Sequence, residues 1–150
     1  MKLASALTER SDLQRRIAEI SKRLTNNAKV QEGDTPAEDP AALLQELDNF
    51  LCRLEELVAK INLTNSMTVS EGETLTELLS RRDSLQQRLR ILRGFLDAAS
   101  CRIDRYSKAE IRILSTVPVA EIQKDVDRYA KELREMNERI QELNWTTELQ

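Results

Sequence analysis

Four long segments repeat apolar residues at intervals of three and four, and this spacing constrains the fold more than any other feature of the sequence. Residues spaced in this way lie on one face of an α-helix, and heptad-like repetition is typical of long helices that pack side by side. The four rows are Leu3, Ala6, Leu13, Ile17, Ile20 and Leu24; Leu43, Leu47, Phe50, Leu54, Leu57 and Ile61; Leu75, Leu78, Leu85, Leu89, Leu92, Leu96 and Ala99; and Val119, Ile122, Val126, Tyr129, Leu133, Met136, Ile140 and Leu143.

The length and composition favour a bundle of such helices. The chain has 150 residues, with aromatic residues at only 3%, three Gly and three Pro. A β-sandwich or barrel needs more aromatic and β-branched faces and more tight turns. Each row covers about 25 residues, or roughly 37 Å of helix at 1.5 Å per residue, and equal lengths suit a bundle. We predict an all-α fold, with residues 1–150 forming a single domain: an antiparallel four-helix bundle with long, coiled-coil-like helices.

Local signals place helix ends and connections. Asp39 is a candidate N-cap, with Pro40 in the first turn of the second helix. The third helix is expected to start near Thr74, with Glu77 in capping-box spacing. Three short segments in the connections, at 29–31, 67–70 and 111–116, are candidates for strands that pair at one end of the bundle.

The second row is wider than one stripe. Leu44, Leu51 and Val58 widen it, so we expect the helix over residues 40–64 to be the most buried. Together with the unbroken fourth row, this helix supplies more apolar surface than one bundle core consumes. The sequence therefore predicts self-association.

The charge alternates in sign along the chain. The formal net charge is −3, and it divides into +3 over residues 2–26, −2 over 40–64, +5 over 81–112 and −3 over 119–150. Alternation suits neighbouring antiparallel helices that attract one another at their edges. The global balance predicts neither nucleic acid nor an anionic membrane as partner.

Several kinds of chemistry are excluded by residue type. Histidine is absent, which removes Ser-His-Asp and Cys-His catalysis and His-ligated metal centres. Cys52 and Cys101 are expected to be buried or half-buried thiols. Glu9 and Arg10 end the first apolar run too early for a secretory signal, and no segment is long enough to span a membrane, so we expect a cytoplasmic protein.

Two arginines stand where the rows require an apolar residue. Arg10 interrupts the first row and Arg82 the third, and Asp12 and Asp83 are close to them in sequence. A guanidinium on an apolar stripe needs a partner, so these four residues are candidates for a buried polar layer between the helices. Such a layer would fix helix register or oligomeric state, or would bind a phosphate or carboxylate; alternatively, both arginines extend to the solvent at the edge.

Two charged clusters suggest weaker alternatives. Carboxylates at Glu55, Glu56, Glu73, Glu77 and Asp83 loosely resemble the Mg²⁺-binding clusters of helical nucleotide pyrophosphohydrolases, although their spacing suits a solvated face better. The basic stretch from 81 to 112 would suit RNA or another anion. It contains Arg88, Arg90, Arg93, Arg102, Arg105 and Lys108, with Tyr106, but aromatic stacking partners are scarce and nucleic-acid binding is not favoured.

Trp145 follows the fourth row directly and is the one tryptophan of the chain. Its burial would stabilise the fold, because loss of a buried Trp typically costs about 3 to 5 kcal/mol. We expect it to fold back over the end of the bundle or to dock on a neighbouring subunit. An exposed recognition tail is the alternative.

The whole chain resembles a family of small bacterial helical proteins that are labelled septicolysin or left as a domain of unknown function. The resemblance is carried by the opening segment 1–14, the loop 27–40, the Arg-Arg-Asp run at 81–83, the segment 111–117 and the ending 140–149. It implies no catalytic residue. A haemolysin is not expected, since neither an export signal nor amphipathic spanning hairpins are found.

The sequence thus favours a self-associating structural or interaction protein with no catalytic activity and no cofactor. Homo-oligomers are expected, with an unidentified protein as a further partner and no membrane. An Mg²⁺-dependent nucleotide pyrophosphohydrolase and an RNA- or anion-binding helical module are the alternatives.

Overall fold

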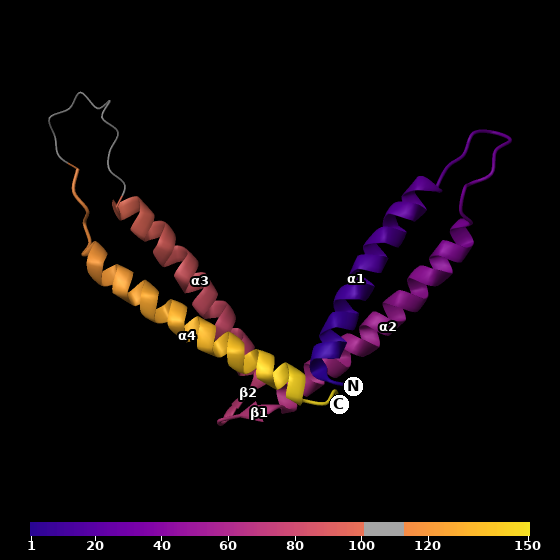
Figure 1. Ribbon diagram of the computed structural model, residues 1–150. Coiled ribbons are helices and arrows are strands. Elements are labelled where there is room, and N and C mark those ends of the chain that lie inside the picture. Colours follow the sequence, from indigo (N-terminus) through magenta and orange to yellow (C-terminus); the bar gives the residue numbers. More distant parts are fainter. Residues whose placement is uncertain (101–112) are drawn as a thin grey trace. The chain divides into compact units, whose positions relative to one another are not determined.

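The computed structural model describes residues 1–100 and 113–150 and confirms an all-α protein. Its helices are α1 (Leu3–Asn26), α2 (Pro40–Met67), α3 (Leu75–Ser100) and α4 (Val119–Thr146), and they are labelled in Figure 1. The helices contain 24, 28, 26 and 28 residues, close to the lengths that the apolar rows predict. Two short strands, β1 (Val69–Ser70) and β2 (Glu73–Thr74), complete the described elements.

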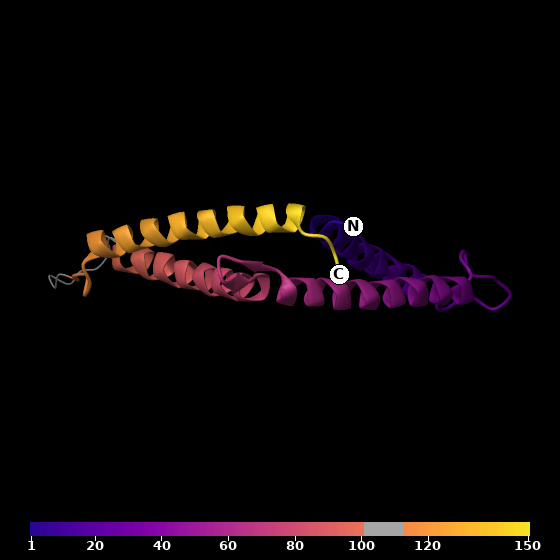
Figure 2. The ribbon, with the colours of Figure 1, turned by 90° about the horizontal axis from the view of Figure 1, so that it is seen from below.

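The chain forms two compact units. One unit contains Met1–Leu75 and Glu142–Gln150, and the other contains Thr76–Gln141. In the first unit α1 and α2 lie side by side and antiparallel, and in the second α3 and α4 do the same (Figures 1 and 2). The expectation of one domain over the whole chain stays a prediction.

The core of the first unit lies between α1 and α2. Its fully buried side chains include Leu3, Ile20, Leu57 and Ile61. Each such side chain contributes roughly 1.5 to 3 kcal/mol relative to an exposed one. The predicted cap of α2 is confirmed, because Asp39 Oδ1 accepts a hydrogen bond from the Ala41 backbone N–H at 3.1 Å.

A tight hairpin connects α2 to α3. Val69 pairs with Thr74 and Ser70 with Glu73, and the turn residues Glu71 and Gly72 both have positive φ, at 52° and 85°. Two consecutive positive φ values match the right-handed twist of the flanking strands. The strand predicted within 67–70 is therefore present, but it pairs with the neighbouring strand β2 and not with a segment of another connection.

The other strand predictions are wrong for the described residues. Residues 29–31 and 113–116 form no strand, and residues 111–112 lie outside the described part of the chain. Segments this short form a sheet only where a turn brings two of them together. In the connection between α2 and α3, Glu71 and Gly72 form such a turn.

The two ends of the chain meet in the first unit (Figures 1 and 2). Leu3 N–H donates to the Thr147 carbonyl at 3.0 Å, and Leu149 N–H donates to the Met1 carbonyl at 2.8 Å. The Met1 ammonium and the Lys2 ammonium both pair with Glu148, at 3.1 and 2.8 Å. Backbone and charge contacts together hold the last residues against the start of α1.

Two burial predictions are wrong. Helix α2 is not the most buried, because it leaves Leu44, Leu51 and Leu63 about half exposed while α1 buries five of its residues. Cys52 is an exposed free thiol and not a buried one. The prediction for Cys101 lies outside the described residues.

Candidate interaction surface

One heptad row of α1 faces α2. Its members are Ala6, Leu13 and Ile20, the C-cap Asn27 continues the row, and all four residues are buried. A second row, four residues further along, contains Leu3, Arg10, Ile17 and Leu24, of which Leu3 is buried and the others are half-buried. A step of four residues rotates a position by about 40° around the helix, so the second row lies directly beside the buried one.

Helix α2 repeats this arrangement. Its buried row contains Leu43, Leu57 and Thr64, with Phe50 half-buried. Next to it lie Leu47 and Leu54, which are half-buried, and then Leu44, Leu51 and Val58. The Leu44 and Leu51 side chains are 51% and 44% exposed.

On the other side of this hairpin, away from the half-exposed leucines, charged side chains of α1 contact α2. Arg53 Nε of α2 donates to Glu9 Oε1 of α1 at 2.7 Å, and Arg53 Nη2 donates to Oε2 at 3.1 Å. The guanidinium of Arg16 lies 5.8 Å from the centroid of the Phe50 ring. Bidentate and cation–π contacts of this kind hold the helices in register along one edge.

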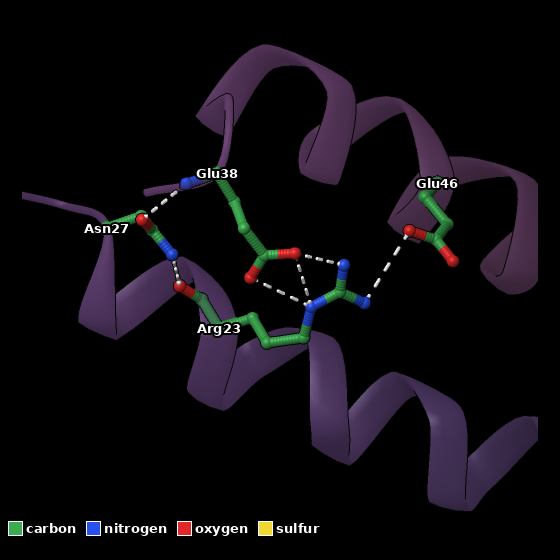
Figure 3. A network of polar contacts seen from close by, with 4 residues as sticks. All are labelled: Arg23, Asn27, Glu38 and Glu46. Carbon is green, nitrogen blue, oxygen red and sulfur yellow. Dashed lines mark hydrogen bonds and ion pairs between the residues drawn. The ribbon is translucent and has the colours of Figure 1, made fainter. Parts of the chain in front are cut away.

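A second polar network closes the same edge near the loop (Figure 3). Arg23 Nε donates to both carboxylate oxygens of Glu38, at 3.0 and 3.1 Å, and Arg23 Nη1 lies 3.7 Å from Glu46 Oε2. Asn27 Nδ2 donates to the Arg23 carbonyl, and the Glu38 backbone N–H donates to Asn27 Oδ1, both at 2.9 Å. Asn27 thus ties the end of α1 to the residue just before the α2 cap.

These contacts shift the pKa of the carboxylates involved. Hydrogen bonds from Arg23 lower the pKa of Glu38, against a smaller opposing effect of desolvation. The pKa of Glu56 is lowered by hydrogen bonds from Lys60 and then Arg53. Both carboxylates are therefore held in the charged form on the polar edge of the hairpin.

The remaining rows define one apolar face of the hairpin. On each helix the half-buried and exposed apolar residues are rotated in the same sense from the buried row. Because α1 and α2 run antiparallel, these residues lie on the same side of the hairpin. We call this side the apolar face; its members are Arg10, Ile17 and Leu24 of α1 and Leu44, Leu47, Leu51, Leu54 and Val58 of α2.

Arg10 is the one charged member of the apolar face. Its side chain is half-buried, and its Nε is buried with no hydrogen-bond partner among the described residues. A guanidinium in this position leaves a strong donor unsatisfied, which is costly unless a partner carboxylate or water reaches it.

The aspartates of the predicted polar layer are paired within their own helices. Asp12 accepts a hydrogen bond from Arg15, and Asp83 accepts one from Arg82, at 2.9 and 2.8 Å respectively. Arg10 and Asp12 belong to the first unit, Arg82 and Asp83 to the second. A layer shared by all four residues stays a prediction.

The acidic cluster gains no support as a metal site. Among residues 1–100 and 113–150 there is no group of three or more Cys, Asp or Glu that would hold a metal ion. Glu56 is instead paired with Lys60 at 2.9 Å and with Arg53 at 3.1 Å. These contacts are those of a solvated charged face.

The basic stretch is only partly described. Arg102, Arg105, Tyr106 and Lys108 lie outside the described residues. Arg88 lies over the Tyr129 ring at 5.1 Å and donates to Tyr129 Oη at 3.1 Å, while Arg128 lies 4.7 Å from the same ring. These contacts join α3 to α4 within the second unit.

Trp145 lies in the last turn of α4, and its side chain is 64% exposed. The residues after it are fixed by their backbone to the start of α1, so the tail itself is docked while the indole is not covered. Docking of Trp145 on a neighbouring subunit stays a prediction. None of the described helices combines the length and apolar character needed to cross a membrane.

Comparisons with known proteins identify relatives but no activity. Residues 10–149 match the model of a "Family of unknown function (DUF6847)". A crystal structure of "a functionally unknown conserved protein from Corynebacterium diphtheriae" has a TM-score of 0.94 and 46% sequence identity, covering 100% of this chain and 99% of that one. A comparison with curated proteins gives no match. Neither description carries the septicolysin label.

Proposed function

The chain belongs to this family of unknown function, and we propose from its structure that it is a non-catalytic interaction protein that self-associates through the apolar face of the α1–α2 hairpin. The observation that carries the proposal is the row of Leu44, Leu51 and Val58 on α2, which lies beside Leu47 and Leu54 and has no covering helix in its own hairpin. Contiguous apolar patches on a folded surface mark interaction sites.

The charge of the two helices supports a second copy as the occupant. The segment that forms α1 has a net charge of +3, and the segment that forms α2 has −2. When the apolar faces of two copies meet, α1 of each copy can lie against α2 of the other, so that opposite charges adjoin at both edges. The same arrangement makes neighbouring helices antiparallel, as in an up-and-down bundle.

Sedimentation equilibrium of the full chain tests the proposal. We expect the wild-type protein to form dimers at micromolar concentration, and the double variant Leu44→Gln/Leu51→Gln to be monomeric. Both side chains are about half exposed, so the helical circular dichroism of the variant should match that of the wild type.

Leu63→Gln is the matched control. Leu63 is 50% exposed on the same helix but lies on a different side from the apolar face. Its substitution should leave the dimer intact. A wild-type monomer across the concentration range would refute the proposal, and turnover in a panel of nucleotides with Mg²⁺ would refute its non-catalytic part.

A further inference from the structure

Arg10 of the apolar face has a chemical requirement that its own hairpin does not meet. Its Nε is buried and has no hydrogen-bond partner, and no ion pair is found for Arg10 in the described part of the chain. The carboxylates closest to it in sequence are engaged elsewhere. Glu9 accepts hydrogen bonds from Arg53, and Asp12 accepts one from Arg15. The guanidinium therefore needs an acceptor from outside the hairpin.

Arg10 lies on the inner part of the apolar face. It follows the buried Ala6 by four residues, so it is rotated by only about 40° from the row that faces α2. Leu54 takes the corresponding inner position on α2, four residues after Phe50. When two such hairpins pack face to face, side chains at this rotation point toward the middle of the four-helix bundle that results.

The charge-matched arrangement of two copies brings both Arg10 side chains to one level. In that arrangement α1 of each copy lies against α2 of the other, which requires a two-fold axis parallel to the helices. Rotation about this axis leaves the height of every residue along the helices unchanged. A side chain that points toward the axis therefore faces its own equivalent, and the two Arg10 guanidiniums lie on opposite sides of the axis at the same height.

The other members of the apolar face supply no acceptor at this level. The ion pair between Glu9 and Arg53 places Leu54 close to the height of Arg10. Val58 lies one turn further along α2, on the side to which Arg10 leans, because side chains on a helix point back toward its N-terminus. Both neighbours are apolar. Two cations brought together among them repel one another, and a doubly charged anion between them satisfies both.

We propose that the dimer binds one small divalent oxyanion, such as phosphate or sulfate, between the Arg10 guanidiniums of its two copies. The inference rests on the proposed self-association and adds to it a ligand that completes the interface. The planar N–H groups of a guanidinium match the oxygens of such an ion. An ion on the two-fold axis presents equal acceptors to both copies.

Sedimentation equilibrium of the full chain at constant ionic strength tests the site. Replacing sodium chloride by sodium phosphate or sodium sulfate should tighten the wild-type dimer by about tenfold, because an ion that binds only the dimer favours it by mass action. Isothermal titration with inorganic phosphate should give one ion for every two chains. A response to glycerol phosphate without one to inorganic phosphate would overturn a free ion as the ligand.

Arg10→Leu is the decisive variant. Its dimer should be at least as tight as that of the wild type in chloride, since an apolar residue replaces an unpaired charge, and it should no longer respond specifically to phosphate. Sulfate and phosphate also strengthen apolar association in general, and any response that Arg10→Leu retains measures this effect. Arg15→Leu is the matched control, because it removes the same charge from α1 at a side chain that pairs with Asp12, and it should respond as the wild type does.

The possible results separate this inference from the proposed function. If the wild type dimerises equally well in chloride and in phosphate, the anion site is refuted and self-association stands. If Arg10→Leu responds to phosphate as strongly as the wild type, or if each chain binds its own ion, an anion shared by two Arg10 side chains is refuted. If the wild type is monomeric with and without phosphate, both are refuted.

Discussion

Arg53 of α2 forms an ion pair with Glu9 of α1 across the hairpin, with Nε and Oε1 2.7 Å apart. The pair lies on the edge opposite the apolar face, and the Arg23 network lies on the same edge (Figure 3). Charged contacts therefore close one side of the hairpin and leave the other side apolar. This asymmetry is the basis for the proposal that the apolar side of the first unit receives a partner.

The buried leucines between α1 and α2 should dominate the stability of the first unit. Leu57 is 0% exposed, so Leu57→Ala should lower the free energy of unfolding by about 2 to 5 kcal/mol through lost burial and the cavity left behind. Urea denaturation followed by circular dichroism measures the change. Leu63→Ala, at a side chain 50% exposed, should cost far less, and equal losses for the two variants would contradict the assigned core.

Asn27 should be needed for the connection between the first two helices. Asn27→Ala leaves the half-buried Glu38 N–H without its acceptor, and the loss of this hydrogen bond should cost about 0.5 to 1.5 kcal/mol. The exposed neighbour Asn26 provides the control, because Asn26→Ala keeps both hydrogen bonds of Asn27. Thermal unfolding should separate the two variants, and similar melting temperatures would show that the tie is dispensable.

The Arg23 network should make stability depend on pH. The folded-state pKa of Glu38 lies below its unfolded value, so the contact stabilises the protein at neutral pH and this stabilisation is lost as the pH falls through the folded pKa. Glu38→Gln should therefore be less stable than the wild type at pH 7, and the difference should vanish in acid.

Glu32→Gln is the control for this pH effect, because Glu32 lies in the same loop and makes no ion pair in the described structure. It should follow the wild type at every pH. A Glu38→Gln variant that differs from the wild type by the same amount at pH 7 and in acid would contradict the assigned role of the carboxylate.

The helices could be predicted because their signals are local. The apolar rows and the Asp39 cap depend on residues within a few turns, and the structure confirms both. The hairpin turn is less visible in the sequence, because Glu71 is an unusual residue at positive φ and the strands are two residues long.

The row that the sequence predicts for α2 is the one that faces α1: Leu43, Leu57 and Ile61 are buried, while Leu44 and Leu51 of the widening row are about half exposed. The spacing does not predict the ion pairs on the other edge of the hairpin, where Arg53 contacts Glu9 and Arg23 contacts Glu46. Because those ion pairs join residues far apart in sequence, no local spacing predicts them.

Two glycines should respond to the same substitution with opposite signs. Gly72 has φ of 85° in the turn between β1 and β2, where a Cβ clashes with the backbone, so Gly72→Ala should destabilise the protein by about 1 to 2 kcal/mol. Gly94 lies within α3, and a Cβ added there meets no atom within 4 Å. Gly94→Ala should stabilise the helix by about 0.8 to 1.0 kcal/mol, because alanine loses less backbone entropy on folding.

Chemical denaturation of both variants and of the double variant measures these effects. The two positions make no common contact, so their free-energy changes should add. Destabilisation by Gly94→Ala would mean that the exposed side of α3 is covered in solution. A neutral Gly72→Ala would mean that the turn adopts another conformation, and the pairing of Val69 with Thr74 would then be lost as well.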